Sequence, residues 1–447
     1  MKGLDINAGF ISWVGKIAEE DAHILQILWS AGCVFYVRTT QPQTLMHLET
    51  SSNIYGVTTN PYNTTLTCGG SSGGEGALLG FRGSCLGIGT DIGGSIRSPA
   101  ANNGLYGFKP TTLRLPVAGW SATMFGSEGI IPTIGPLSTS LEGCKLFMKT
   151  LIAAKPWLTE PCLLPFPWKD ELEPFYPQGK RKLKVGVLWD DGVVKPHPPI
   201  TRALERVVKH LRTRGNVEVV EWKPYKHDEA WEIIANLYFS DGGAQEMAAM
   251  ASSHEPWRPL TTHILSPTHN THVQAHSVPS LWTAIVRRDA YRTAYATYWH
   301  EKYGDVDVVL CPAGPSAAPK LDTARYWGYT SQWNLLDYPA LVFPVDRVGA
   351  SERANGMGQQ AGAYQPRNEK DAYNWRQWEE SHDGTTMQGT GGYENAPVSL
   401  QIVGRRYEDE KVLQACELIH QETGCPFVEF ADFAARRTES DRIVSCL

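Results

Sequence analysis

Apolar positions along the chain form short stretches, some with helical spacing and others continuous. Spacing of three and four residues predicts helices over 17–31 and 200–214. Continuous, mostly apolar runs of four to seven residues predict buried strands at 33–37, 184–189, 217–220, 305–310, 339–345 and 397–403. Helices and strands follow one another along the chain without an internal repeat, so the pattern indicates an α/β fold.

Two stretches interrupt this pattern. Residues 156–177 are rich in proline and tryptophan, which indicates a boundary or a crossover between parts of the fold. Residues 349–392 are polar and rich in glycine, glutamine and charge, and we predict a surface loop there. A chain of 447 residues is long enough for one large domain with appendages or for two domains.

Composition narrows the classes of function. The hydrophobic fraction of 42% and the charged fraction of 20% are typical of a folded globular protein. A net charge of −6 without a basic stripe argues against a nucleic-acid binder. No run of eighteen apolar residues exists, so we expect no membrane span. Nine scattered cysteines predict reduced thiols in a cytoplasmic protein.

The segment 69–100, rich in glycine and serine, carries the candidate chemistry. Two glycines before Ser95 permit a backbone that exposes its hydroxyl and gathers neighbouring N–H groups around one oxygen. Ser71 offers a second hydroxyl in a constrained turn, suited to relaying a proton. A flexible connecting loop is the alternative interpretation of such a segment. Phosphate binding is disfavoured, because neither glycine-rich phosphate motif fits the spacing.

Over residues 69–76 and 89–99 this segment resembles the amidase signature almost position for position. Further similar segments occur at 42–46, 53–56, 107–111, 333–340 and 396–406. The likeness is greatest to the fungal acetamidase-like branch of the family. It implies a single amidase-signature domain over 1–447, an α/β/α fold with a mixed central sheet flanked by helices, and hydrolysis of a monocarboxylic acid amide with no cofactor and no metal.

The family uses a Ser–cis-Ser–Lys triad, and the resemblance transfers two of its members to this chain. It implies that Ser95 forms the acyl-enzyme and that Ser71, in a cis turn, bridges Ser95 to the lysine. The backbone of four consecutive residues corresponds to the family's oxyanion hole: Ile92, Gly93, Gly94 and Ser95. Ser72 and Arg97 match positions that support the loop, and Leu45 matches a residue that lines the acyl site.

The triad lysine is missing from the sequence. In the family it belongs to a Ser-Leu-Lys-Asp motif, and counting back from Ser71 places it just before Met1. We therefore expect the chain to lack roughly the first hundred residues of a typical member, through a truncated gene model or a true loss. Lys2 and Lys16 are the nearest lysines, and we predict that both are surface residues.

Three functions stay open at this point. The first is an amide hydrolase that acts through acyl-Ser95, and the second is an inactive remnant that binds a ligand or a partner. The third is a transamidating relative that passes ammonia to a charged tRNA, which the acetamidase likeness disfavours. The expected partner is a small-molecule amide, with no nucleic acid and no membrane span, and the chain is a candidate homodimer.

Two further groups of residues have alternative interpretations. Four histidines within fourteen residues suggest either a metal site or a surface loop, and the loop is the favoured interpretation: His263, His269, His272 and His276. Trp120, Met124 and Phe125 are candidates for the wall of the acyl pocket, with ordinary core packing as the alternative.

Overall fold

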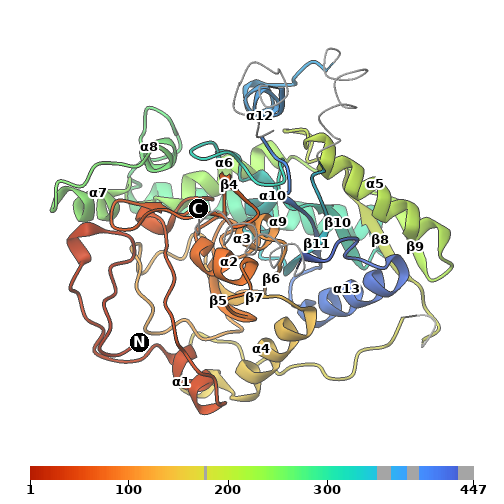
Figure 1. Ribbon diagram of the computed structural model, residues 1–447, viewed down its shortest axis with the longest axis horizontal. Coiled ribbons are helices and arrows are strands. Elements are labelled where there is room, and N and C mark those ends of the chain that lie inside the picture. The colour runs from red at the N-terminus through yellow and green to blue at the C-terminus, as the bar shows by residue number, and fades with distance from the viewer. Residues whose placement is uncertain (176–178, 350–363, 380–391, 431–447) are drawn as a thin grey trace, which may run out of the picture.

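An eight-stranded sheet forms the centre of the computed structural model, which describes residues 1–175, 179–349, 364–379 and 392–430 (Figure 1). Across the sheet the strands are β5 (Leu86–Asp91), β7 (Thr133–Ser138), β6 (Tyr106–Lys109), β11 (Ala340–Arg347), β12 (Pro397–Val403), β10 (Val308–Pro312), β8 (Leu183–Val187) and β9 (Val217–Glu221). Neighbours from β5 to β10 pair antiparallel, whereas β10, β8 and β9 pair parallel. The mixed central sheet is therefore confirmed.

Helices cover both faces of this sheet. One face packs against α4 (Leu141–Ala153), α5 (Pro198–Thr213) and α13 (Asp409–Thr423). The other packs against α6 (His227–Tyr238), α9 (Val278–Tyr303) and α10 (Gly328–Leu335). The short helices α2 (Gly73–Gly80) and α3 (Arg97–Asn102) lie with the antiparallel strands and carry the glycine-serine segment.

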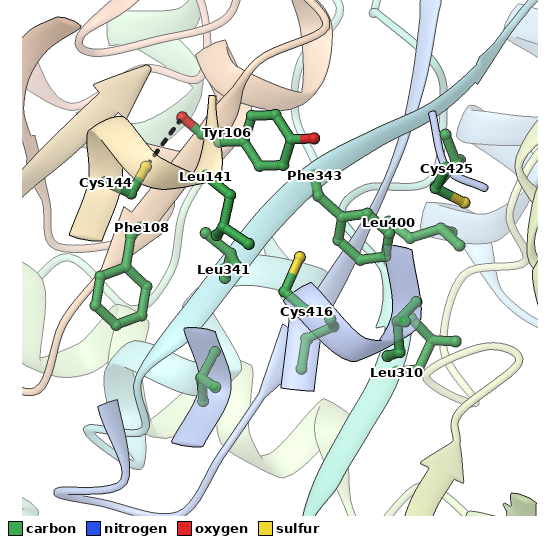
Figure 2. Close-up of a cluster of buried hydrophobic side chains, with 14 of the residues drawn as sticks. Tyr106, Phe108, Leu141, Cys144, Leu310, Leu341, Phe343, Leu400, Cys416 and Cys425 are labelled. Carbon is green, nitrogen blue, oxygen red and sulfur yellow. Dashed lines mark hydrogen bonds between the residues drawn. The ribbon is translucent and has the colours of Figure 1, made fainter. Parts of the chain in front are cut away.

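The continuous apolar runs are explained by burial on both faces. In β10, Val308 and Leu310 join the apolar cluster under α4, α5 and α13, whereas Val309 and Cys311 join the cluster under α6, α9 and α10. Successive side chains of a strand point to opposite faces, so a strand covered twice needs an apolar residue at every position. Figure 2 shows the first cluster, where Phe343 and Leu400 of neighbouring strands face Cys416 of α13.

Most elements predicted from the sequence are present. The strands β8, β9, β10, β11 and β12 and the helix α5 match the predicted segments to within a few residues. The predicted helix at 17–31 is the shorter α1 (His23–Ser30). The segment 156–177 begins with a 3₁₀ turn (Pro156–Leu158) and leads from α4 toward β8, so it is a crossover. Its last two residues lie outside the described ranges.

The strand predicted at 33–37 is wrong. This segment has no regular structure, and Val34 is 82% exposed. An apolar run becomes a buried strand only beside a partner strand, and none of the described strands pairs with it. Its side chains instead line the cavity described below, where Phe35 stacks on Trp29 at a ring distance of 5.6 Å.

The surface loop predicted at 349–392 is wrong where the structure describes it. Residues 364–379 contain the helix α12 (Glu369–Glu379), while 350–363 and 380–391 lie outside the described residues. Trp375 and Trp378, three positions apart, are both buried, and Trp378 stacks on Tyr393 at 5.8 Å. The segment is polar overall, so a single apolar face of two tryptophans did not stand out from its composition.

The helix α9 is the longest in the described structure, with 26 residues. Its inner face packs four aromatic residues into the core: Tyr291, Tyr295, Trp299 and Tyr303. Its outer face carries charge, including Arg287 and Asp289. Among the described residues, no helix is both long enough and apolar enough to cross a membrane.

We predict that Trp378→Ala lowers the free energy of unfolding by about 3–5 kcal/mol, because it leaves a large cavity beneath α12. Trp282→Ala is the matched control, since Trp282 is 65% exposed on α9 and its loss should cost about 0.5 kcal/mol or less. Urea unfolding of both variants measures the difference. Equal effects of the two substitutions would contradict the burial of α12.

Candidate active site

Ser95 lies where β5 turns into α3. The strand ends at Asp91, the chain turns through Ile92, Gly93 and Gly94, and Ser95 precedes the first turn of α3. Gly94 has a φ of +132°, a backbone conformation that residues other than glycine rarely adopt. Ser95 is only 5% exposed, so the turn presents its hydroxyl to an enclosed space rather than to bulk solvent.

Ser71 lies in a second turn that is bonded to the first. The Gly70–Ser71 peptide bond is cis. The Ser72 N–H donates to the Ser95 carbonyl at 3.1 Å, and Ser72 Oγ accepts from the Thr90 N–H at 3.1 Å. These two bonds hold the Ser71 turn against both ends of the loop that carries Ser95.

Both serines line one cavity of about 880 Å³. Leu45, Ser71, Ile92 and Ser95, four of the residues predicted to contact substrate, share its wall. Trp120, Met124 and Phe125 line it too, which favours the pocket wall over ordinary core among the two interpretations of these residues. Gly93 and Gly94 are not among the lining residues: Tyr238, which does line the cavity, packs directly against Gly93, and Thr330 packs against Gly94.

No lysine and no histidine is among the described residues that line the cavity. Lys2 and Lys16 are exposed, as predicted, and Lys16 Nζ lies 4.4 Å from the Trp13 ring centre. Lys109 is fully buried, but its Nζ donates to the Pro110 carbonyl at 3.0 Å, away from the cavity wall. The general base of the expected triad is therefore not found among these lysines.

A buried ion pair lies beneath the Ser95 loop. Asp91 and Arg97 have no exposed side-chain surface, and two hydrogen bonds of 3.0 Å join them. Asn334 of α10 donates to Asp91 at 2.8 Å, and Gln401 of β12 accepts from Arg97 at 2.8 Å. Burial alone would raise the pKa of Asp91, but the Arg97 guanidinium and these hydrogen bonds outweigh it and hold the pKa below its usual value.

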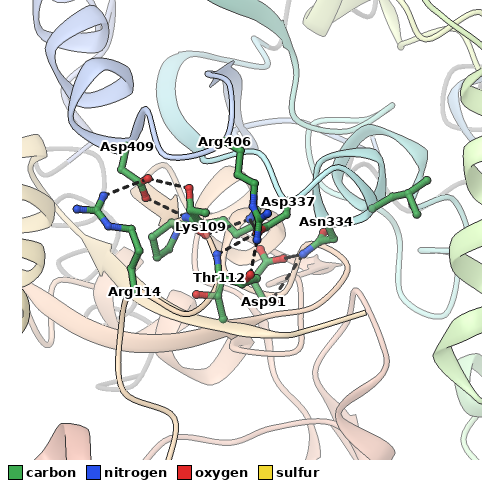
Figure 3. Close-up of polar contacts among 12 residues, drawn as sticks. Asp91, Lys109, Thr112, Arg114, Asn334, Asp337, Arg406 and Asp409 are labelled. Atoms are coloured by element: carbon green, nitrogen blue, oxygen red, sulfur yellow. Dashed lines mark hydrogen bonds and ion pairs between the residues drawn. The ribbon is translucent and has the colours of Figure 1, made fainter. Parts of the chain in front are cut away.

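Further buried polar contacts continue this layer toward α13 (Figure 3). Asp337 accepts from the Thr112 backbone at 2.9 Å and from Arg406 at 2.7 Å, and lies 3.9 Å from Lys109 Nζ. Arg114 pairs with Asp409 at 3.1 Å. These contacts connect the segment after β6 to the start of β11 and to the segment after β12.

The backbone around Ser95 offers fewer oxyanion donors than the four predicted residues. The Gly94 N–H already donates to Asp91 Oδ1 at 2.8 Å, so it is not free for a substrate oxygen. The N–H groups of Ile92, Gly93 and Ser95 have no hydrogen-bond partner among the described residues. Three unpaired N–H groups within one turn, close to a hydroxyl, can stabilise the oxyanion of acyl transfer.

Comparison with known proteins agrees with this geometry. The family model described as Amidase matches residues 1–413, which is most of the chain. The chain belongs to the amidase family. A putative amidase of Schizosaccharomyces pombe is 44% identical over 419 residues, covering 94% of this chain and 74% of its own length. An acetamidase of Emericella nidulans is 37% identical, covering 93% of this chain and 74% of its own length.

Among solved structures, a fatty acid amide hydrolase superposes with a TM-score of 0.86 at 34% identity. The match covers 96% of this chain and 72% of that one. The amidase-signature α/β fold, the recognition of the fungal acetamidase-like relatives and the assignment as an enzyme that acts on amide C–N bonds are therefore confirmed.

The four histidines of this amidase do not form a cluster. His276 contacts the Asn236 carbonyl at 3.1 Å, and His269 contacts the Thr268 hydroxyl at 3.1 Å. Burial lowers the pKa of His263 to about 4. In the part of the chain that the structure describes, no three His, Cys, Asp or Glu side chains are grouped closely enough to hold a metal ion.

Several residues that hold the Ser95 loop are not predicted from the sequence. Asn334 and Gln401 belong to segments that resemble the family, so their positions were marked but their contact with Asp91 and Arg97 was not. Tyr238 and Thr330 donate hydrogen bonds to the Ile92 and Gly93 carbonyls. No local pattern marks either residue, because each contact spans well over a hundred positions of the chain.

Glu49 is an unusual carboxyl beneath the Ser71 turn. Its backbone lies so close to Gly70 that a Cβ on that glycine would collide with it. The carboxyl is fully buried, and Oε2 accepts from the Asp322 N–H at 2.9 Å. Burial raises the pKa of Glu49 to about 7, and the neighbouring Asp322 carboxylate adds to the rise while Arg258 opposes it.

We predict that Asp91→Ala lowers the free energy of unfolding by about 3–5 kcal/mol, because it leaves the Arg97 guanidinium buried without its partner charge. Asp170→Ala removes a carboxylate that is 74% exposed and pairs with Lys149 at 2.9 Å, so its effect should stay near about 0.5 kcal/mol. Chemical denaturation compares the two variants. A small effect of Asp91→Ala would show that the buried pair is dispensable.

The buried Glu49 carboxyl makes the stability of the protein depend on pH. Between pH 4.5 and about 7 the folded state keeps the Glu49 proton that the unfolded chain has lost, so stability falls as the pH rises through this interval. The raised pKa of Glu49 lowers the free energy of unfolding at pH 8 by roughly 3 kcal/mol relative to its value at low pH. Glu49→Gln abolishes the titration, and its amide can also donate to the unpaired Asp322 Oδ1.

Glu49→Gln should therefore be more stable than the unmodified protein at pH 8 and equal to it near pH 4. Unfolding in urea at pH 4, 6 and 8 measures the difference between the two proteins, so titrations that they share cancel. A difference that does not change with pH would rule out a raised pKa at Glu49.

Proposed function

We propose that this chain hydrolyses a carboxylic acid amide to an acid and ammonia or an amine, through an acyl-enzyme on Ser95. The observation that carries the proposal is the joint position of Ser71 and Ser95 on one cavity, linked by the Ser72–Ser95 hydrogen bond. Covalent acyl transfer needs a nucleophile, a route for its proton and donors for the oxyanion. Ser95, Ser71 and the free N–H groups of Gly93 and Ser95 fill these roles.

In the proposed reaction, Ser95 Oγ attacks the amide carbonyl carbon, its proton passes to Ser71, and the Ser71 proton passes to solvent water, because the described cavity wall holds no lysine or histidine to accept it. The carbonyl oxygen becomes negatively charged against the N–H groups of Gly93 and Ser95. The C–N bond then breaks as the leaving nitrogen takes a proton back along the same route. Water attacks the resulting ester in the same way, which releases the acid and restores Ser95.

A second candidate is a protein that binds amides without cleaving them. It is favoured by one observation, that no lysine or histidine is among the described residues of the cavity wall. A serine hydroxyl without a base is a weak nucleophile, although an oxyanion hole alone retains some rate acceleration. The two candidates differ in the reactivity of Ser95.

The cavity also bears on the substrate. Apolar side chains from several segments form much of its wall, including Leu28, Phe35, Trp120, Phe147 and Leu237. This lining favours an amide with an apolar acyl group, within a family whose members include an acetamidase and a fatty acid amide hydrolase. A single domain over 1–447, a homodimer and a cytoplasmic location stay predictions from the sequence.

A fluorophosphonate probe tests the proposal, because it modifies an activated serine covalently. We expect labelling of the unmodified protein at Ser95 and its loss in Ser95→Ala, together with a fall in amide turnover of at least about a thousandfold. Ser121→Ala is the matched control, since Ser121 lies on the same cavity wall outside both serine turns. Mass spectrometry of the labelled peptides locates the adduct.

Equal labelling or turnover in Ser95→Ala would remove Ser95 as the nucleophile. An unmodified protein that binds amides but neither turns them over nor takes the probe would establish the second candidate instead. Ser71→Ala completes the series, because loss of the relay should slow labelling while leaving the Ser95 side chain in place.

A further inference from the structure

Two hydroxyl groups from outside the glycine-serine segment hold the carbonyls of the Ser95 loop. Tyr238 Oη, at the end of α6, donates to the Ile92 carbonyl at 3.0 Å. Thr330 Oγ1, on α10, donates to the Gly93 carbonyl at 2.6 Å. Both side chains are almost fully buried, so water does not compete strongly for these bonds.

These bonds fix more than the carbonyl oxygens. The Ile92–Gly93 peptide is trans, since the cis bonds among the described residues lie elsewhere. In a planar trans peptide the C=O and the N–H point in opposite directions. Anchoring the Ile92 carbonyl on Tyr238 therefore sets the direction of the Gly93 N–H, and anchoring the Gly93 carbonyl on Thr330 sets that of the Gly94 N–H.

The two N–H groups differ in what they meet. The Gly94 N–H reaches Asp91 Oδ1 and is satisfied within the protein. The Gly93 N–H has no partner among the described residues, and its neighbours Ile92 and Ser95 both line the cavity. A buried N–H without a partner is costly unless a ligand completes it.

The side chains that carry these hydroxyls pack tightly against the backbone of the Ser95 loop. A Cβ on Gly93 would lie 2.7 Å from Tyr238 Oη and 2.9 Å from the Trp327 ring. The phenol thus packs against the glycine backbone, and the peptide has little freedom to rotate. Burial raises the pKa of Tyr238 well above its ordinary value, so the hydroxyl keeps its proton and remains a donor.

We propose that Tyr238 is a positioning residue of the oxyanion hole, whose hydroxyl, through the Ile92 carbonyl, directs the Gly93 N–H toward the substrate oxygen. This inference rests on the proposed acyl-enzyme on Ser95. Tyr238 lines the same cavity, but its hydroxyl is committed to the Ile92 carbonyl, and in this assignment it acts on the oxyanion through that peptide. A hydrogen bond to the carbonyl also polarises the peptide, which strengthens its N–H as a donor.

Tyr238→Phe tests this assignment, because it removes the hydroxyl and keeps the ring that packs against Trp327 at 5.9 Å. Tyr291→Phe is the matched control: Tyr291 is buried on α9, and its hydroxyl donates to the Tyr225 carbonyl at 2.9 Å, with no contact to the Ser95 loop. Tyr238→Phe loses one phenol-to-carbonyl hydrogen bond, whereas Tyr291→Phe loses contacts to the carbonyls of Tyr225 and Lys226 and the bond that its hydroxyl accepts from the Gln332 amide, so the control removes at least as much hydrogen bonding. Only Tyr238→Phe frees the Ile92–Gly93 peptide.

We expect kcat to fall about tenfold or more in Tyr238→Phe while KM changes by no more than about twofold, because the lost donor acts mainly on the transition state. Tyr291→Phe should leave kcat within about twofold of the unmodified protein. A purely structural role for Tyr238 predicts equal effects of the two variants on kcat, and that result would overturn the inference.

A crystal structure of Tyr238→Phe provides a second measurement that does not need turnover. The inference expects the Ile92–Gly93 peptide to rotate away from its position in the unmodified protein, and an unchanged peptide overturns it. Failure of the proposed function has a different signature. In that case the unmodified protein neither turns over amides nor takes the fluorophosphonate at Ser95, whatever the orientation of the peptide.

Discussion

A carboxylate and a guanidinium that are both fully buried must satisfy each other, and Asp91 and Arg97 do so where β5 becomes the Ser95 loop. Asp91 also accepts from the N–H groups of Gly94 and Ile96, so the same carboxylate that neutralises Arg97 sets the path of the backbone through Ser95. Asn334 and Gln401 use the remaining hydrogen-bonding capacity of the pair. A change in any of these groups is transmitted to the loop, because an unpaired charge in this interior is strongly unfavourable.

The sheet explains why these partners meet. Asp91 ends an outer strand of the antiparallel half, whereas Gln401 lies in β12 near the middle, and Asn334 lies in the helix that precedes β11. Arg97 reaches across this distance because its side chain is long and entirely enclosed. The helices α6 and α10, which cover the same face, supply Tyr238 and Thr330 to the other side of the loop. The Ser95 loop is therefore held between the sheet and a helical layer.

The sequence predicts the parts of this arrangement that have a strong local signal. Strands such as β8 and β12 are predicted because burial on both faces demands unbroken apolar runs, and the roles of Ser71 and Ser95 are predicted because their segment resembles the amidase signature. The strand predicted at 33–37 is wrong because the apolar side chains of this segment face a cavity. The helix α12 is not predicted because only two of its buried side chains, both tryptophans, are apolar. The positions of Tyr238 and Thr330 depend on the packing of distant helices, which local spacing does not encode.

The hydrogen bond from the Ser72 N–H to the Ser95 carbonyl joins the two serine turns through main-chain atoms alone. The separation of the turns is thus a property of the scaffold and is independent of which atom ends the side chain at position 95. Replacement of the Ser95 hydroxyl by a cysteine thiol leaves this scaffold bond intact. The fold therefore separates the choice of reacting atom from the geometry that serves it, which makes position 95 a natural starting point for redesigning the chemistry of the cavity.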